Sequence, residues 1–141
     1  MRTFSLILIA FFLLLSGALV LITVPTLGER PLSHWSLNMG IWLSALAVSA
    51  LYLASWLLAR KEHGRSHAVV FWTYLPALVI SLITGASWGV VGHVMETEKA
   101  DFSTAFDYSM LIFAAGYGVV VLLYCGALAY VVRKRNALIA G

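Results

Sequence analysis

Hydrophobic residues are gathered into four long stretches that hold no Asp, Glu, Lys or Arg, separated by short polar segments. The stretches cover residues 4–24, 39–59, 68–95 and 108–132, and each has 21 residues or more. A helix of roughly 20 apolar residues crosses the hydrocarbon core of a bilayer, which is about 30 Å thick. The pattern therefore predicts an all-α membrane protein with four transmembrane helices.

The arrangement of the rest of the chain favours a single transmembrane domain over residues 1–141. The longest segments outside the stretches are 25–38 and 96–107, which are too short for a soluble domain. Alternation of polar and apolar residues, as in a membrane-spanning strand, is absent, and a helix satisfies its own backbone in lipid. Short connections between successive spans predict an up-down helical bundle.

The first stretch has the composition of either a membrane span or a signal peptide. Its apolar run from Phe4 to Val24 is longer than the usual core of a signal peptide. A small-residue cleavage motif followed by a polar segment is also missing near its end. We therefore expect this stretch to remain in the protein as the first span.

Composition excludes several classes of protein. Of the 141 residues, 62% are hydrophobic and 11% are charged, with a mean hydropathy of +0.94. Soluble domains carry about 25% charged residues, so this chain is not a soluble enzyme, a nucleic-acid-binding domain or a disordered tail. The nine Lys and Arg residues are scattered and form no stripe for nucleic acid. A single cysteine excludes a disulfide framework and a cysteine zinc site.

The distribution of charge predicts an orientation in the membrane. Seven of the nine basic residues lie on one side of the spans: Arg2, Arg60, Lys61, Arg65, Arg133, Lys134 and Arg135. Only Arg30 and Lys99 lie on the other side, together with five of the six acidic residues. Because cytoplasmic loops are enriched in Lys and Arg, both termini are predicted to be cytoplasmic, an N-in/C-in topology. A bacterial inner membrane is the expected location.

Small residues gather on one face of the third span and on one face of the fourth. The third span carries Gly85, Gly89 and Gly92 on one arc. The fourth carries an arc of small residues made of Ala114, Ala115, Gly118, Cys125, Gly126 and Ala129. Because lipid gives no hydrophobic reward for association, such faces indicate close helix packing. We expect the two spans to pack through these arcs with Cys125 buried. A hinge or a substrate path is the alternative interpretation.

Two tyrosines point to further contacts of the fourth span. Tyr117 and Tyr124 are seven residues apart, on the face opposite the small arc. A phenol hydroxyl in hydrocarbon needs a hydrogen-bond partner, so this face is expected to contact another helix of the chain or another subunit.

Chemistry inside the membrane is limited because no Asp, Glu, Lys or Arg lies inside any of the four spans. Proton-coupled carriers, pumps and voltage sensors usually need such a group, and small four-span multidrug exporters carry an acidic residue in their first span. The four histidines lie in loops or near span ends, which disfavours haem held between helices. We predict no cofactor and no catalytic activity of the chain's own.

Two polar groups at the membrane edges are candidate sites. His93 and Glu96 are three residues apart and share a helix face. Their side chains are of the kind that binds a divalent cation. The alternative is that they are simply interfacial polar residues. Arg60, Lys61 and Arg65 could hold anionic lipid headgroups, or they serve only to set the orientation.

These observations favour a small accessory subunit of a larger inner-membrane complex, respiratory or transport, with a structural or assembly role. Its partners would be membrane lipids and other membrane subunits, or copies of itself, and not nucleic acid. One alternative is a self-assembling transporter or channel whose path is lined by hydroxyl residues such as Ser44, Ser49, Ser81 and Thr84. Another is a membrane subunit that binds a cofactor or carries redox chemistry.

Overall fold

The computed structural model describes residues 2–26, 28–29, 31–59 and 65–140. Its elements are the four long helices α1 (Arg2–Thr23), α2 (Leu32–Ala59), α3 (Arg65–Thr97) and α4 (Phe102–Ala140), with a short 3-10 turn η1 (Val24–Thr26) after α1. Each of the four helices is long and apolar enough to cross a membrane. Over the described residues, the prediction of an all-helical fold with four helices able to span a membrane is confirmed.

All four helices are longer than the stretches that predicted them, and α3 and α4 are the longest. α3 has 33 residues and α4 has 39. At 1.5 Å per residue these lengths correspond to about 50 and 58 Å, against a hydrocarbon core of about 30 Å. The ends of both helices therefore extend through the headgroup region, and the polar residues that flank the apolar stretches are helical.

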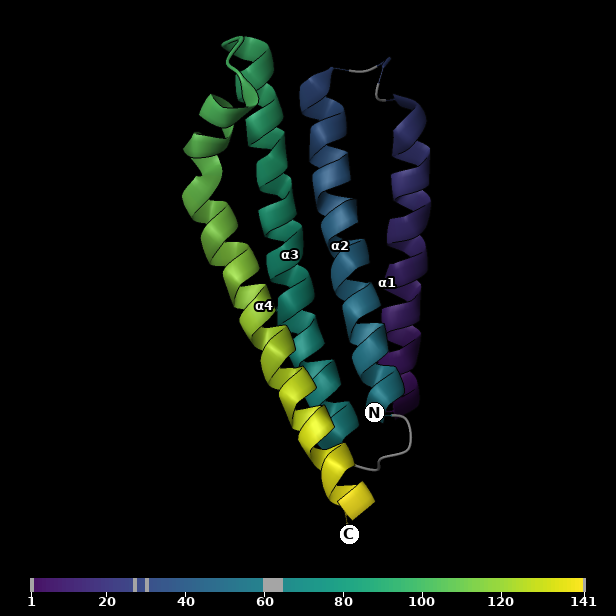
Figure 1. Cartoon of the computed structure of the whole chain (residues 1–141). Coiled ribbons are helices and arrows are strands. Elements are labelled where there is room, and N and C mark those ends of the chain that lie inside the picture. The colour runs from purple at the N-terminus through teal and green to yellow at the C-terminus, as the bar shows by residue number, and fades with distance from the viewer. Residues whose placement is uncertain (1, 27, 30, 60–64, 141) are drawn as a thin grey trace.

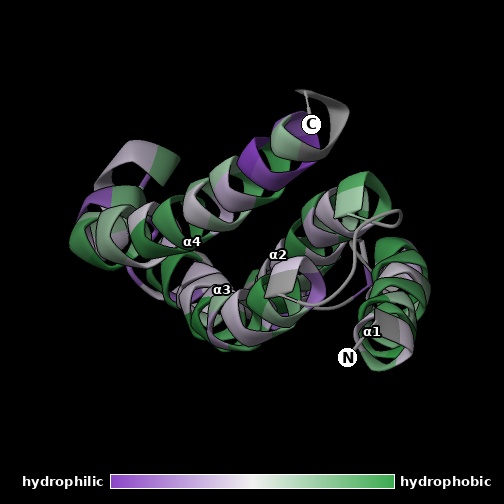
Figure 2. Cartoon of the chain, turned by 90° about the horizontal axis from the view of Figure 1, so that it is seen from below, coloured by the Kyte–Doolittle hydropathy of each residue, from purple (hydrophilic) through white to green (hydrophobic). Residues whose placement is uncertain are grey.

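Consecutive helices run in opposite directions, and both termini lie at the same end of the molecule (Figure 1). Seen end-on, the helices follow one another along an arc in the order α1, α2, α3, α4 (Figure 2). α2 and α3 form the most extensive pairing, α1 packs chiefly on α2, and α4 packs chiefly on α3. The centre of the molecule is therefore the α2–α3 pair.

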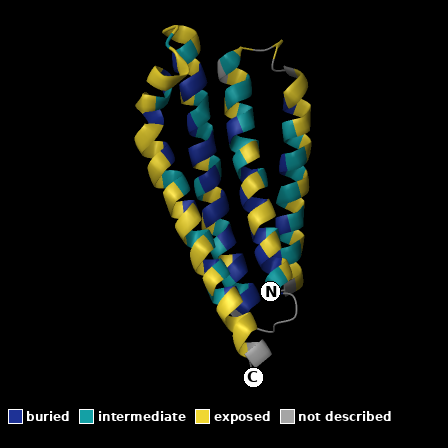
Figure 3. Cartoon of the chain, viewed as in Figure 1, coloured by how far each residue is buried: buried dark blue, intermediate teal, exposed yellow. Residues whose placement is uncertain are grey.

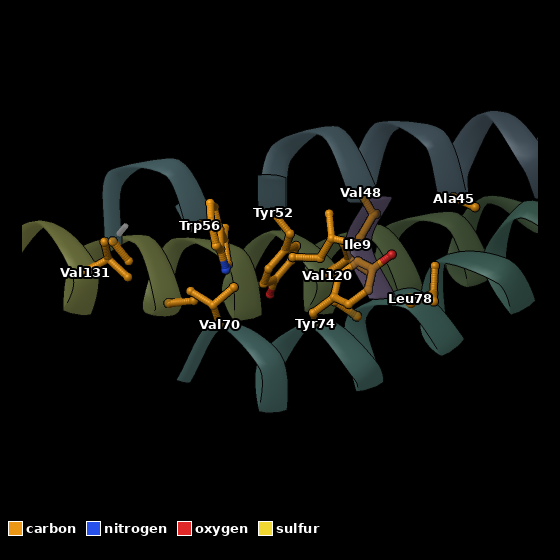
Figure 4. Close-up of a cluster of buried hydrophobic side chains, with 13 residues drawn as sticks. Ile9, Ala45, Val48, Tyr52, Trp56, Val70, Tyr74, Leu78, Val120 and Val131 are labelled. Atoms are coloured by element: carbon orange, nitrogen blue, oxygen red, sulfur yellow. The ribbon is translucent and has the colours of Figure 1, made fainter. Parts of the chain in front are cut away.

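Burial follows this order, with most buried positions on α2 and α3 and long exposed faces on α1 and α4 (Figure 3). The main core cluster is built around Tyr52 of α2 and Tyr74 of α3, whose side chains are fully buried and whose ring centroids lie 5.2 Å apart (Figure 4). Ser49 Oγ lies 2.7 Å from the Tyr74 hydroxyl, which satisfies that buried group within the core.

α2 and α3 meet at two glycines. A Cβ atom on Gly85 would lie 2.8 Å from the carbonyl carbon of Gly40 and 2.9 Å from Cα of Ile41. A Cβ on Gly40 would in turn meet the Gly85 carbonyl oxygen. The two backbones are in direct contact because neither residue carries a side chain, which is the packing that small residues permit in membranes.

α3 and α4 are joined by a tight turn, residues 98–101. Lys99 adopts a left-handed conformation, with φ of 52°, immediately after α3. Asp101 precedes α4, and its Oδ1 accepts a hydrogen bond of 2.9 Å from the backbone N–H of Thr104. The carboxylate therefore caps α4 by satisfying an N–H that has no partner within the helix.

α4 packs on α3 through a seven-residue pattern and not through the predicted small arc. The buried residues of α4 are Ala105, Ser109, Phe113, Val120, Ala127 and Val131. Gly116 continues this spacing, and a Cβ there would lie 2.8 Å from Cβ of Thr84 on α3. The repeat resembles the a and d positions of a coiled coil, in which large and small residues interlock.

Candidate functional site

A groove, named here the α2–α4 groove, opens between α2 and α4 and has a volume of about 670 Å³. One face of α2 from Trp35 to Leu51 lines it, together with Trp88 of α3 and with Tyr117, Val120 and Val121 of α4. Two features make it possible. α2 presents small residues there, including Gly40, Ser44 and Ala47, and α4 rests mainly on α3. The volume lies in the usual range of small-molecule sites.

The polar centre of the groove is the hydroxyl of Tyr117. Nε1 of Trp88 donates a hydrogen bond of 3.1 Å to this oxygen, and Ser44 Oγ lies 2.8 Å from it. One residue from each of α2, α3 and α4 thus meets at a single point. Because an indole N–H is a donor only, the Tyr117 oxygen must act as acceptor toward Trp88.

An aromatic cluster at the α3–α4 interface holds Tyr117 in place. The Phe113 ring lies nearly parallel to the Tyr117 ring at a centroid distance of 6.2 Å, and Trp88 lies 4.5 Å from Phe113. Phe106 stacks on the other side of Phe113 at 5.1 Å. The ring of Tyr117 is therefore positioned by neighbours on its own helix and on α3.

Both tyrosines touch helices of the same chain, which is one of the two alternatives that the sequence left open. Tyr117 contacts Ser44 and Trp88, and the ring of Tyr124 lies 5.5 Å from Tyr52 in an edge-to-face arrangement. The hydroxyl-bearing face of α4 is accordingly turned toward α2 and α3.

The glycines selected from the sequence divide into two groups. Gly85, Gly89 and Gly92 face α2, where their nearest neighbours come from Gly40, Leu37 and Ser36. A Cβ on Gly118 or Gly126 would have nothing within 4 Å.

The small arc of α4 is therefore exposed, contrary to the expectation that it packs on the third span. Cys125, expected to be buried there, is also exposed. The reason is that the interlocking pattern through Phe113, Gly116 and Val120 turns the opposite side of α4 toward α3.

The edge residues form no assembled site in the described part of the chain. His93 and Glu96 are both exposed, and the nearest contact of the His93 ring is Thr97 Oγ1 at 3.5 Å. The described residues contain no group of three His, Cys, Asp or Glu side chains that could hold a metal ion. Arg60 and Lys61 lie outside the described residues, and of Arg65 only its position as the first residue of α3 is described.

Sequence reasoning missed three contributors to these contacts. Gly40 escaped notice because α2 carries small residues around its whole circumference, although Gly40 and Ser44 have the four-residue spacing of a packing face. Gly116 lies outside the conspicuous small arc. His67 was assigned to a loop but is buried in the first turn of α3, with its ring 5.7 Å from Trp56.

The functional interpretation of this geometry rests on its own chemistry. Comparison of the chain with models of protein families, with curated proteins and with solved structures finds no similar protein.

Proposed function

We propose that the protein is a non-catalytic accessory subunit of a larger inner-membrane complex, attached through an exposed face of α4. This small-residue face consists of Ala114, Ala115, Gly118, Cys125, Gly126 and Ala129, with Leu111 and Leu122 beside them. The single observation that supports the proposal is that all these residues are exposed, while the opposite side of α4 is packed on α3.

The chemistry of this face matches a transmembrane helix as its partner. Gly118 and Gly126 leave open space at the helix surface, which lets a second backbone approach closely. Association of helices in lipid depends on such close packing because lipid chains are as apolar as the side chains. The four apolar stretches also lack the Asp, Glu, Lys or Arg that independent ion-coupled transport usually requires, so we assign the partner helix to an unlike subunit.

The proposed orientation places both termini in the cytoplasm, with the α3–α4 turn on the opposite side of the membrane. It rests on the excess of Lys and Arg near the termini and in residues 60–65. The even number of spanning helices is consistent with termini on one side.

The alternative of a self-assembling channel gains no support from three of the four hydroxyl residues assigned to its path, whereas Ser44 lines the α2–α4 groove. Ser49 is bonded to Tyr74, Ser81 donates to the backbone oxygen of Leu78 at 2.8 Å, and Thr84 donates to that of Ile80 at 2.8 Å. These hydroxyls are engaged within the helices or in the core.

The proposal is tested by photo-crosslinking in the native membrane. A photoreactive amino acid at Leu122, on the small-residue face, should give one adduct with an unlike membrane polypeptide. The matched control is Leu14 on α1, since both side chains are 73% exposed. We expect no discrete adduct from position 14, because that position faces lipid in the proposed assembly.

A substitution tests whether the adduct depends on close packing at the small-residue face of α4. Gly118→Leu fills the open space and should abolish the adduct from position 122, whereas Ala18→Leu on an exposed position of α1 should leave it unchanged. An adduct of twice the chain mass would instead establish self-association. Absence of any discrete adduct at position 122 would contradict the proposal.

A further inference from the structure

The α2–α4 groove contains one hydrogen-bond donor more than the protein can satisfy. Ser44 and Tyr117 each carry one hydroxyl proton, and the bond between them uses only one of the two. Trp88 donates its own N–H proton to the Tyr117 oxygen, so it accepts neither of the two hydroxyl protons. Among the described residues, no acceptor is bonded to the remaining proton. Whichever hydroxyl donates to the other, one O–H is left in the groove.

The position of this donor within the membrane restricts what can accept from it. Ser44 is five residues from the start of the second apolar stretch, and Trp88 is seven residues from the end of the third. The second stretch matches the hydrocarbon core in length, so at 1.5 Å per residue Ser44 places the pair about 7–8 Å inside it, whereas the third stretch is longer than the core. A bare donor at that depth is costly, because hydrocarbon offers it no acceptor.

We propose that the α2–α4 groove binds a lipid-soluble molecule of the quinone class. A quinone combines a carbonyl acceptor for the spare Ser44–Tyr117 proton with a flat ring and an apolar chain that suit the rest of the groove. The ester carbonyls of phospholipids lie at the interface and not at this depth. The inference concerns binding only and includes no electron transfer. It is independent of the proposed contact through α4, which uses the opposite side of that helix.

The lining of the groove agrees with this ligand. Trp35 and Trp88 add aromatic surface near the polar pair, and aromatic rings favour offset or edge contacts with another flat ring. The remaining wall is aliphatic, with Leu43, Val48 and Val121. Apolar lining with a few polar groups that fix orientation is the usual form of a small-molecule site.

The test uses decylubiquinone and the full chain in nanodiscs of a single saturated phosphatidylcholine. Binding is followed by quenching of tryptophan fluorescence, with empty nanodiscs correcting for partition into lipid. Wild type should show saturable quenching. Because either hydroxyl alone can supply the donor, Ser44→Ala and Tyr117→Phe should each stay within about twofold of wild type. Tyr117→Phe also frees the Trp88 N–H, so the variant that removes every donor is Ser44→Ala/Tyr117→Phe/Trp88→Phe. This triple variant should bind roughly three- to tenfold more weakly, as for loss of one hydrogen bond.

A second Ser–Tyr pair in the same molecule provides a matched control. Ser49 and Tyr74 form a similar bond of 2.7 Å but do not line the groove, so the Ser49→Ala/Tyr74→Phe variant should bind as wild type does. Ala47→Phe keeps both groove hydroxyls and fills the space, and it should remove saturable binding. Equal quenching in all variants would overturn the proposal. A retained phosphatidylcholine that decylubiquinone does not displace, detected by native mass spectrometry, would also overturn it.

Discussion

Individual glycines decide how closely the central helices approach each other. Gly40 and Gly85 bring the backbones of α2 and α3 into direct contact, and the neighbours of Gly85 are backbone atoms. The neighbour of Gly89 is the flexible end of the Leu37 side chain, which can move aside. Glycines on one face of α3 therefore differ in which atoms an added side chain would displace.

This difference predicts a graded response to alanine. Gly85→Ala should lower the free energy of unfolding by about 1–3 kcal/mol, because two backbones must separate. Gly89→Ala should cost less, and Gly118→Ala should change stability by less than about 1 kcal/mol, since its Cβ meets nothing. Denaturation by sodium dodecyl sulfate in mixed micelles measures all three. Equal effects at positions 85 and 118 would contradict the packing described.

At the scale of elements, the turn between α3 and α4 reverses the direction of the chain. Lys99, two residues after the end of α3, adopts a left-handed conformation, and Asp101 precedes α4 as its cap. Hydrogen bonds to its carboxylate from the Thr104 side chain and then from the Thr104 backbone N–H lower the pKa of Asp101 below its ordinary value of 3.8. The cap is therefore strongest when Asp101 is ionised.

A pH dependence follows for the first turn of α4. The lowered pKa means that the contribution of Asp101 to stability is complete above pH 3.8 and is lost as pH falls through the folded-state pKa. Hydrogen exchange at the Thr104 amide should accelerate relative to its intrinsic rate over that acid range. Asp101→Asn keeps an acceptor without a titrating carboxyl, so it should remove the pH dependence. An unchanged pH profile in Asp101→Asn would refute the assignment.

At the scale of the whole molecule, an arc of antiparallel helices places both termini at one end (Figure 1). Four basic residues lie close to one terminus or the other in the sequence: Arg2, Arg133, Lys134 and Arg135. The structure places the two termini at one end, and the positive-inside rule predicts that this end is cytoplasmic.

Topology reporters test this arrangement. Alkaline phosphatase fused after residue 141 should be inactive and green fluorescent protein at that position fluorescent, because the C-terminus is predicted to be cytoplasmic. Insertion of the phosphatase in the α3–α4 turn should give activity. Replacing Arg133, Lys134 and Arg135 with glutamine should weaken the bias toward this orientation. An active phosphatase after residue 141 of the wild-type chain would reverse the predicted orientation.

The spans were predictable because hydropathy is a local property of the sequence, and α1 agrees with its stretch to within a few residues. The partner of each face was not predictable from composition alone. Small residues on α3 and α4 indicate close packing without naming the neighbour, and Gly85 meets Gly40 of α2. The Ser44–Tyr117–Trp88 contact joins residues far apart in sequence, so only the three-dimensional arrangement reveals it.

The order of packing along the arc has a consequence for biosynthesis. Each helix after the first packs extensively on the helix synthesised immediately before it: α2 on α1, α3 on α2 and α4 on α3. Such neighbour contacts need little loop closure, so they form quickly. Each helix after the first therefore finds a packing partner already in the bilayer when it leaves the ribosome. The α2–α4 groove is completed last, when α4 inserts.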